Sequence, residues 1–101
     1  MHYQISSDGA ARTARVDGQI TFQEQKDFRE LLNELFSESG SSYIFDLTAV
    51  THIDSAGLGM FLIGRKRAQE SGATVVLRHP PSNVRHTLEL AKFHELFSVE
   101  E

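Results

Sequence analysis

The segment from Tyr43 to Gly64 constrains the fold of this chain more than any other part of it. It opens with Tyr43 to Leu47, which is mostly apolar and rich in residues that favour strands. A short polar turn, Thr51 to Asp54, separates this run from a second apolar run. Asp54 and Ser55 are both good N-cap residues, and they directly precede the second run. The pattern therefore predicts a strand, a loop and a helix that begins at Ser55.

Two glycines, Gly57 and Gly59, fall in the first turns of this predicted helix. Each glycine in a helix interior destabilises it by about 1 kcal/mol relative to alanine. A helix start that accepts both glycines is expected to have its backbone exposed or closely approached there. We therefore expect Ser55 to stand at a helix N-terminus with little side-chain cover, on a surface that another molecule can reach.

The hexapeptide Asp54-Ser55-Ala56-Gly57-Leu58-Gly59, preceded by an apolar strand ending in Asp46-Leu47, resembles the signature of STAS domains. More narrowly, it is similar to that of free-standing bacterial anti-sigma factor antagonists, and the resemblance extends from about Tyr3 to Val99. The position after the serine is often Ser or Thr in that family and is Ala56 here. Ser55 is therefore the only hydroxyl residue of the hexapeptide.

The resemblance implies a function in a partner-switching pathway. An anti-sigma factor with serine kinase activity would bind the unphosphorylated form, release its client, and phosphorylate Ser55 to abolish binding. A PP2C-type phosphatase would restore the binding form. The implied partner-binding residues lie in the hexapeptide and in the Gly18–Thr21 loop, which the family places next to it: Asp54, Ser55, Ala56, Gly57, Leu58, Gly59, Gly18, Gln19 and Thr21.

The N-terminal part of the chain reads as a hairpin followed by a helix. Tyr3 to Ile5 alternates apolar and polar residues, and Ala11 to Asp17 continues the alternation after a Ser7-Asp8-Gly9 turn signal. Asp17-Gly18 is expected to break the second strand. Thr21 and Glu24 form a capping-box pattern for a helix. Its apolar stripe consists of Phe28, Leu31, Leu32, Leu35 and Phe36, and Gly40 is expected to be its C-cap.

The C-terminal part continues the alternation of helices and strands. The helix from Ser55 is expected to run to about Ser71 and to stop at Gly72, and Thr74 to Leu77 is a short β-branched strand. Ser82 is expected to cap a third helix. That helix carries Val84, Leu88 and Ala91, and the apolar tail that must then dock carries Phe93, Leu96, Phe97 and Val99. The expected core includes Phe28, Leu32, Leu62 and Leu88.

This order of elements predicts an α/β class fold in one STAS-like domain over residues 1–101. We expect a four- or five-stranded mixed sheet with Tyr43–Leu47 central, and three to four helices. The composition agrees with a folded domain of this size, since 101 residues carry 40% hydrophobic side chains.

Charge and composition exclude several classes of function. A net charge of −4 and a pI near 5.7 argue against nucleic-acid binding, which favours basic surfaces. The chain has no cysteine, the N-terminal residues have no signal-peptide pattern, and the longest apolar run, Ala56–Gly64, is too short for a bilayer. We therefore expect a cytoplasmic protein without membrane insertion. We also expect it to be monomeric when free.

No residue pattern indicates an enzyme. His52, Asp54 and Ser55 are the residue types of a hydrolase triad, but neighbours in one short loop cannot easily adopt the relayed geometry that a triad needs. The five histidines lack metal-ligand spacing, and the glycines lack the flanking residues of a nucleotide-binding loop. We expect no catalytic residues, no metal and no cofactor.

Two alternatives stay open at this point. The glycine-lined helix start could bind a small ligand or anion, which would require a concave pocket with convergent polar groups. The chain could instead be a subunit of a larger signalling assembly. A phosphorylation switch, by contrast, requires Ser55 to be exposed on a flat or convex surface.

Overall fold

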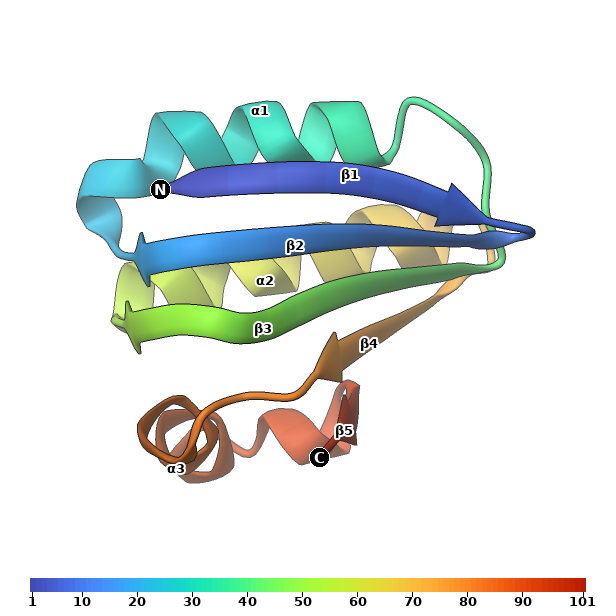
Figure 1. Cartoon of the computed structure of the whole chain (residues 1–101). Coiled ribbons are helices and arrows are strands. Elements are labelled where there is room, and N and C mark those ends of the chain that lie inside the picture. The colour runs from blue at the N-terminus through green and yellow to red at the C-terminus, as the bar shows by residue number, and fades with distance from the viewer.

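A five-stranded mixed sheet organises the computed structural model, which describes residues 1–101 (Figure 1). The strands lie in the order β1-β2-β3-β4-β5; β1 and β2 are antiparallel, and all other neighbours are parallel. The strands are β1 (His2–Asp8), β2 (Ala11–Ile20), β3 (Ser42–Ile53), β4 (Thr74–Arg78) and β5 (Ser98–Glu100). The helices are α1 (Gln25–Leu35), α2 (Ser55–Glu70) and α3 (Ser82–Leu90), with short 3-10 turns at Phe22–Glu24 and Phe93–Glu95. The predicted fold class is confirmed.

Strand β3 is central, as predicted, but it is longer than the sequence suggested. The polar segment that we expected to be a turn continues the strand, because Gln19 pairs with His52 and Ile20 pairs with Ile53 in the parallel register of β2 and β3. The expected break at Asp17-Gly18 is also wrong. The ladder shifts register on either side of this dipeptide, and Gly18 adopts a φ of +96°, which lets β2 run on to Ile20.

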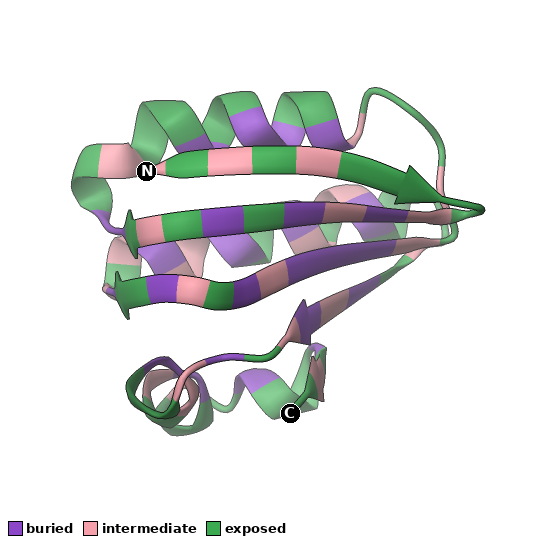
Figure 2. Ribbon diagram, viewed as in Figure 1, coloured by how far each residue is buried: buried purple, intermediate pink, exposed green.

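Helices α1 and α2 lie side by side on one face of the sheet (Figure 1). Three phenylalanines join these layers: Phe28 of α1, Phe45 of β3 and Phe61 of α2. Their ring centroids are 5.1–5.9 Å apart, with edge-on contacts between Phe61 and each of the other two. All three side chains are fully buried, and this aromatic contact sets how the two helices sit on the central strand. Figure 2 shows buried positions along β2, β3, α1 and α2.

The prediction of a core position is wrong for one residue, Leu62. Phe28, Leu32 and Leu88 are buried as expected, but the side chain of Leu62 is 41% exposed. Helix α2 carries apolar residues around most of its circumference, so periodicity did not identify the face that packs against the sheet. Phe61, the preceding residue, takes the core position instead.

The helix ends differ in part from the predicted caps. Thr21 and Glu24 are paired, but the Glu24 carboxylate accepts both the backbone N–H (3.0 Å) and the hydroxyl (2.6 Å) of Thr21, and the turn they enclose is a 3-10 turn. Gly72 follows α2 as predicted, with a φ of +75°. Ser82 is the first residue of α3 rather than its cap, because Pro81 occupies that position.

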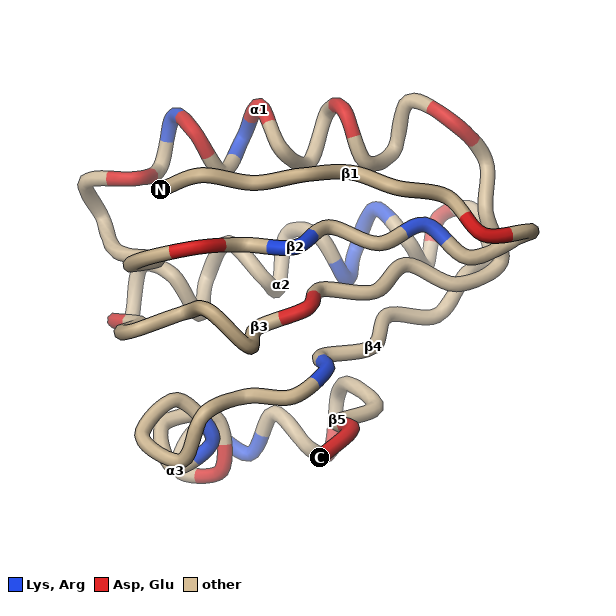
Figure 3. The backbone as a smooth tube through the Cα atoms, viewed as in Figure 1, with Lys and Arg blue, Asp and Glu red and all other residues tan.

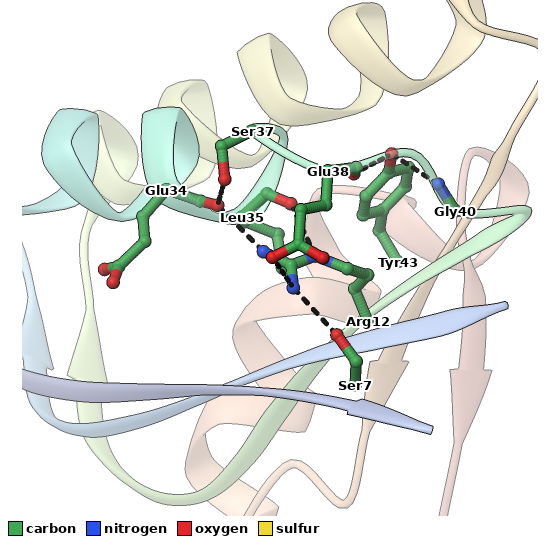
Figure 4. A network of polar contacts seen from close by, with 8 residues as sticks. All are labelled: Ser7, Arg12, Glu34, Leu35, Ser37, Glu38, Gly40 and Tyr43. Atoms are coloured by element: carbon green, nitrogen blue, oxygen red, sulfur yellow. Dashed lines mark hydrogen bonds and ion pairs between the residues drawn. The ribbon is translucent and has the colours of Figure 1, made fainter. Parts of the chain in front are cut away.

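Arg12, rather than Gly40, satisfies the carbonyl groups at the end of α1. Its side chain comes from β2 and is 6% exposed, and it donates to the carbonyl oxygens of Leu35 (3.0 Å) and Glu34 (2.9 Å) (Figure 4). It also donates to the Ser7 hydroxyl at 2.7 Å. A cation at a helix C-terminus is favourable because the free carbonyls carry partial negative charge. Arg12 thus ties β1, β2 and α1 together.

The apolar tail docks as expected through Phe93 and Phe97, but Leu96 is 41% exposed. Phe93 and Phe97 are buried and stack with ring centroids 5.0 Å apart. This contact positions β5, which adds to β4 as the fifth strand.

The burial difference within the helical layer generates a stability prediction. Leu32→Ala should lower the free energy of unfolding by about 2–5 kcal/mol, because it removes a buried side chain from a packed core. Leu62→Ala should change it by less than about 1 kcal/mol, because the side chain is substantially exposed. Urea denaturation of both variants measures the difference. Equal losses would contradict the assignment of Leu62 to the surface.

Candidate functional site

Ser55 is the first residue of α2, at the carboxyl end of the central strand. Asp54 is the N-cap: its backbone is extended, and its Oδ1 accepts the N–H of Gly57 at 2.9 Å. Ser55 is exposed, and its hydroxyl makes no hydrogen bond within the chain. The sequence-based placement of Ser55 at a helix start, and of Asp54 as a cap, is therefore what the structure has.

The second oxygen of Asp54 fixes the neighbouring segment. Oδ2 accepts the backbone N–H of Phe22 at 3.1 Å, and the N–H of Asp54 donates to the carbonyl of Ile20 at 3.3 Å. These bonds hold the end of β2 and the turn before α1 against the start of α2. The expected proximity of the Gly18–Thr21 segment is thus observed, although Gly18 to Ile20 belong to β2 rather than to a loop.

The hydrogen bonds of Asp54 also keep it ionised. The N–H of Gly57 is the main reason that the pKa of Asp54 lies below its usual value. Burial is the next largest effect and raises the pKa, whereas the N–H groups of Phe22 and Ala56 and the nearby His52 lower it further. The carboxylate is therefore a fixed negative charge beside Ser55.

The two glycines of the hexapeptide have different surroundings, so each is present for a different structural reason. A Cβ atom on Gly57 would lie 2.1 Å from the carbonyl oxygen of Ile20 and 2.8 Å from the side chain of Ile53, so the start of α2 sits too close to the sheet for any side chain. A Cβ atom on Gly59 would meet nothing within 4 Å. Gly57 is required by internal packing, whereas Gly59 leaves the outer surface open.

The expected partner-binding residues fall into three groups by exposure. Ser55 and Gln19 are exposed, whereas Gly57 and Thr21 are buried and hold the site together without offering side chains to another molecule. The remaining five are half-buried at the surface: Asp54, Ala56, Leu58, Gly59 and Gly18.

Three exposed apolar side chains beside this site escaped the sequence analysis. Phe22 is 67% exposed and follows Thr21 directly. Leu62 and Ile63 are 41% and 57% exposed, and they lie about two helical turns after Ser55, on the same face of α2. The only feature of the sequence that indicated an exposed Phe22 was its place outside the apolar stripe of the first helix, which begins at Phe28. We call Phe22, Ser55, Gly59, Leu62 and Ile63 the switch face.

The structure shows no metal-binding cluster, and no cavity at the Asp54–Gly59 turn. No three His, Asp or Glu side chains come together in a way that could hold a metal ion. The four surface cavities are lined by residues outside the Asp54–Gly59 turn. None of the helices combines the length and the apolar character needed to cross a membrane.

Sequence comparison decides the family. The model of the STAS domain matches residues 4–101. The chain belongs to the STAS domain family. A STAS-domain containing protein of Pseudomonas aeruginosa is 32% identical to it over 94 residues, which is 93% of this chain and 92% of the relative.

Solved structures share the STAS fold at low sequence identity. A putative anti-sigma factor antagonist of Thermotoga maritima has a TM-score of 0.88 at 17% identity, covering 98% of this chain and 86% of that one. The anti-sigma factor antagonist SpoIIAA in its unphosphorylated form has a TM-score of 0.79 at 14% identity, covering 97% and 87%. A sulfate transporter family protein of Wolinella succinogenes also matches, with a TM-score of 0.77 at 16% identity over 90% and 76%. STAS domains therefore occur both in anti-sigma factor antagonists and in transporters.

The glycines of the STAS hexapeptide generate a matched pair of predictions. Gly57→Ala should destabilise the protein by about 1–3 kcal/mol, because the new methyl group overlaps the carbonyl oxygen of Ile20 and α2 must shift. Gly59→Ala should stabilise it by up to about 1 kcal/mol, because the helix gains a better former in open space. Thermal denaturation measures both. A stabilising Gly57→Ala would refute the close approach of α2 to the sheet.

The lowered pKa of Asp54 generates a pH prediction. The folded-state pKa lies below the unfolded-state value, so the cap contributes stability that is present above about pH 4 and is lost as the pH falls through the folded-state pKa. Asp54→Asn should therefore cost about 1 kcal/mol at neutral pH and less in acid. Urea denaturation across the pH range measures this, with Asp8→Asn at the β1–β2 turn as the control. A constant difference at all pH values would contradict the charged cap.

Proposed function

We propose that this STAS domain is an anti-sigma factor antagonist whose protein binding is switched by phosphorylation of Ser55. The observation that carries the proposal is the exposed Ser55 at the first residue of α2, held by the Asp54 cap with its hydroxyl unengaged. A kinase needs an accessible hydroxyl of this kind. The similarity to SpoIIAA adds support, since that protein has structures in an unphosphorylated and a phosphorylated form.

The proposed chemistry is the transfer of a phosphoryl group to Ser55 and its later removal by hydrolysis. The Ser55 Oγ attacks the γ-phosphorus of ATP, loses its proton, and releases ADP. Hydrolysis by a PP2C-type phosphatase returns the hydroxyl and inorganic phosphate. In both steps the chain is the substrate, and the catalytic groups belong to its partners.

The charge around Ser55 explains why phosphate would act on binding. The Asp54 carboxylate already engages the N–H of Gly57 in the first turn of α2, so it competes with a phosphate for the N–H groups of the helix start. The two segments that form the site, residues 16–25 and 48–64, contain no Lys or Arg. A phosphate would therefore add about 1.5–2 negative charges beside Asp54, with no Lys or Arg within these two segments to pair with it.

The switch face gives the partner an apolar surface to bind. Phe22, Leu62 and Ile63 are all exposed around Ser55 and the open backbone at Gly59. Exposed apolar groups around a small residue are typical of a protein interface. We assign this surface to an anti-sigma factor with kinase activity, which the unphosphorylated form would bind and thereby separate from its client.

A small-ligand or anion sensor is the second candidate function. The similarity to a sulfate transporter family protein favours it, but that similarity concerns the fold alone. The open surface at Ser55 favours a protein partner, because a ligand site needs a concave pocket.

Phosphorylation of Ser55 should weaken binding of the anti-sigma factor by about a hundredfold or more, because a dianion at a closely packed interface without a cation costs several kcal/mol. Ser55→Ala should bind as the wild type does and resist inactivation. Ser55→Asp should weaken binding less than phosphate does, because it adds about one charge rather than two. Calorimetric titration of candidate anti-sigma factor kinases from the same organism measures these affinities.

Matched controls separate the switch from a loss of folding. The phosphorylated protein, Ser55→Ala and Ser55→Asp should each unfold within about 1 kcal/mol of the wild type, since a helix start tolerates these residues. Ser71→Ala at the far end of α2 should change neither binding nor phosphorylation. Equal affinity for phosphorylated and unphosphorylated protein, or phosphate found at another residue in protein isolated from its own cells, would refute the proposal.

A further inference from the structure

Strand β1 leaves the outer edge of the sheet unpaired. It pairs on one side with β2 over its full length, His2 to Asp8, and no strand lies on its other side. Natural edge strands are usually short, or protected by Lys, Pro or a bulge. β1 has none of these protections: its seven residues pair with β2 in an unbroken register and carry their only carboxylate at Asp8. The edge is therefore open to an added strand.

Helix α1 forms a shelf beside this edge. It packs against β1 and β2, and in Figure 1 it extends past the outer edge of β1. An extended segment added to β1 would point alternate side chains toward this shelf. Whatever α1 presents on that flank therefore selects the segment.

The flank of α1 that faces β1 is acidic. Asp27, Glu30 and Glu34 are exposed and follow one another at helical spacing of three and four. Figure 3 shows acidic positions along the whole of α1, with basic positions between them in its first half. Burial is the main reason that the pKa of the Tyr3 hydroxyl on β1 lies above its usual value, and all three carboxylates, Glu34 foremost, raise this pKa further. We call these three residues the acidic row.

The opposite flank of α1 has a different character. Arg29 lies in the groove between α1 and α2, and Asn33 accepts a hydrogen bond from Arg67 of α2 at 2.9 Å. None of the acidic row takes part in an ion pair with a Lys or Arg of this chain. No Lys or Arg of this chain therefore lies within ion-pair distance of these carboxylates, although Lys26 precedes Glu30 by about one helical turn on the same helix.

We propose that the β1 edge binds an extended, basic segment of a partner protein, which adds to the sheet as a sixth strand and places alternate Lys or Arg side chains against the acidic row. The backbone of β1 supplies the hydrogen bonds, and the carboxylates supply the selectivity. Alternate residues of a strand are about 6.6 Å apart, and Glu30 and Glu34 are about 6 Å apart along the helix axis, so two successive cations match these two carboxylates. This site is separate from the switch face and does not depend on phosphorylation of Ser55.

A second copy of this chain is a poorer occupant of the same edge. An antiparallel pairing of β1 with its own copy would bring the two α1 helices together, each with its acidic row toward the other. Like charges brought together in this way oppose association. The acidic row therefore admits a basic strand and disfavours self-pairing.

The test uses a synthetic peptide that alternates arginine and valine over seven residues, labelled with a fluorophore and titrated with the full chain. Fluorescence anisotropy should show binding that weakens with added salt. The double variant E30Q/E34Q should bind about tenfold more weakly, because it removes two charge pairs. The matched control E70Q/E89Q removes two exposed carboxylates from α2 and α3 and should bind as the wild type does. Both variants should retain the urea midpoint of the wild type.

Backbone pairing is tested separately. Two peptides, each methylated at the backbone nitrogen of alternate residues, test this. Methylation of the residues whose N–H groups face β1 should abolish binding, whereas methylation of the other set should not, because only one set of N–H groups faces β1. The amide protons of β1 should become protected from hydrogen exchange when the peptide binds. Equal binding by E30Q/E34Q, or no difference between the methylated registers, would overturn the proposal. A concentration-dependent dimer by sedimentation, in which the amide protons of β1 are already protected from hydrogen exchange without the peptide, would assign the edge to a second copy and overturn the proposal as well.

Discussion

The hydrogen bonds of the Asp54 carboxylate are the interaction on which the candidate site depends. One oxygen accepts the N–H of Gly57 inside α2, and the other accepts the N–H of Phe22 before α1. A single side chain therefore joins two segments that lie 32 residues apart in the sequence. Because these bonds favour the ionised carboxylate, the same contact that orients Ser55 also gives the site its charge.

Close packing beneath α2 makes this arrangement rigid. Gly57 lies against the backbone of Ile20, and Phe61 anchors the next turn among the aromatic rings of the core. The helix start therefore has little freedom to move when its surface is modified. Under the proposed function, phosphorylation of Ser55 acts through charge at an interface rather than through refolding of the domain.

The polar groups of the fold divide the surface into separate regions. Arg12 holds the end of α1 to β2 and, through Ser7, to β1. This contact fixes α1 beside the open edge of the sheet, on the side away from α2. The same helical layer thus presents an apolar surface around Ser55 and an acidic one beside β1, and two partners could bind without competing for one place.

The sequence by itself determined the features that depend on neighbouring residues. The strand at Tyr43–Leu47, the cap at Asp54 and the helix start at Ser55 follow from residues within a few positions of one another, because strand periodicity and capping act over short distances. The core position of Phe28 followed in the same way, since α1 is apolar on one side only.

Only the tertiary structure decided the features whose partners are remote in the sequence. Strand β3 continues to Ile53 because β2 pairs with it, and α1 is capped by Arg12, which lies 23 residues before Leu35. Leu62 faces solvent because α2 is apolar on several sides, so only contact with the sheet selects the buried one. Local patterns fix where elements begin, whereas packing fixes which of their faces are left for a partner.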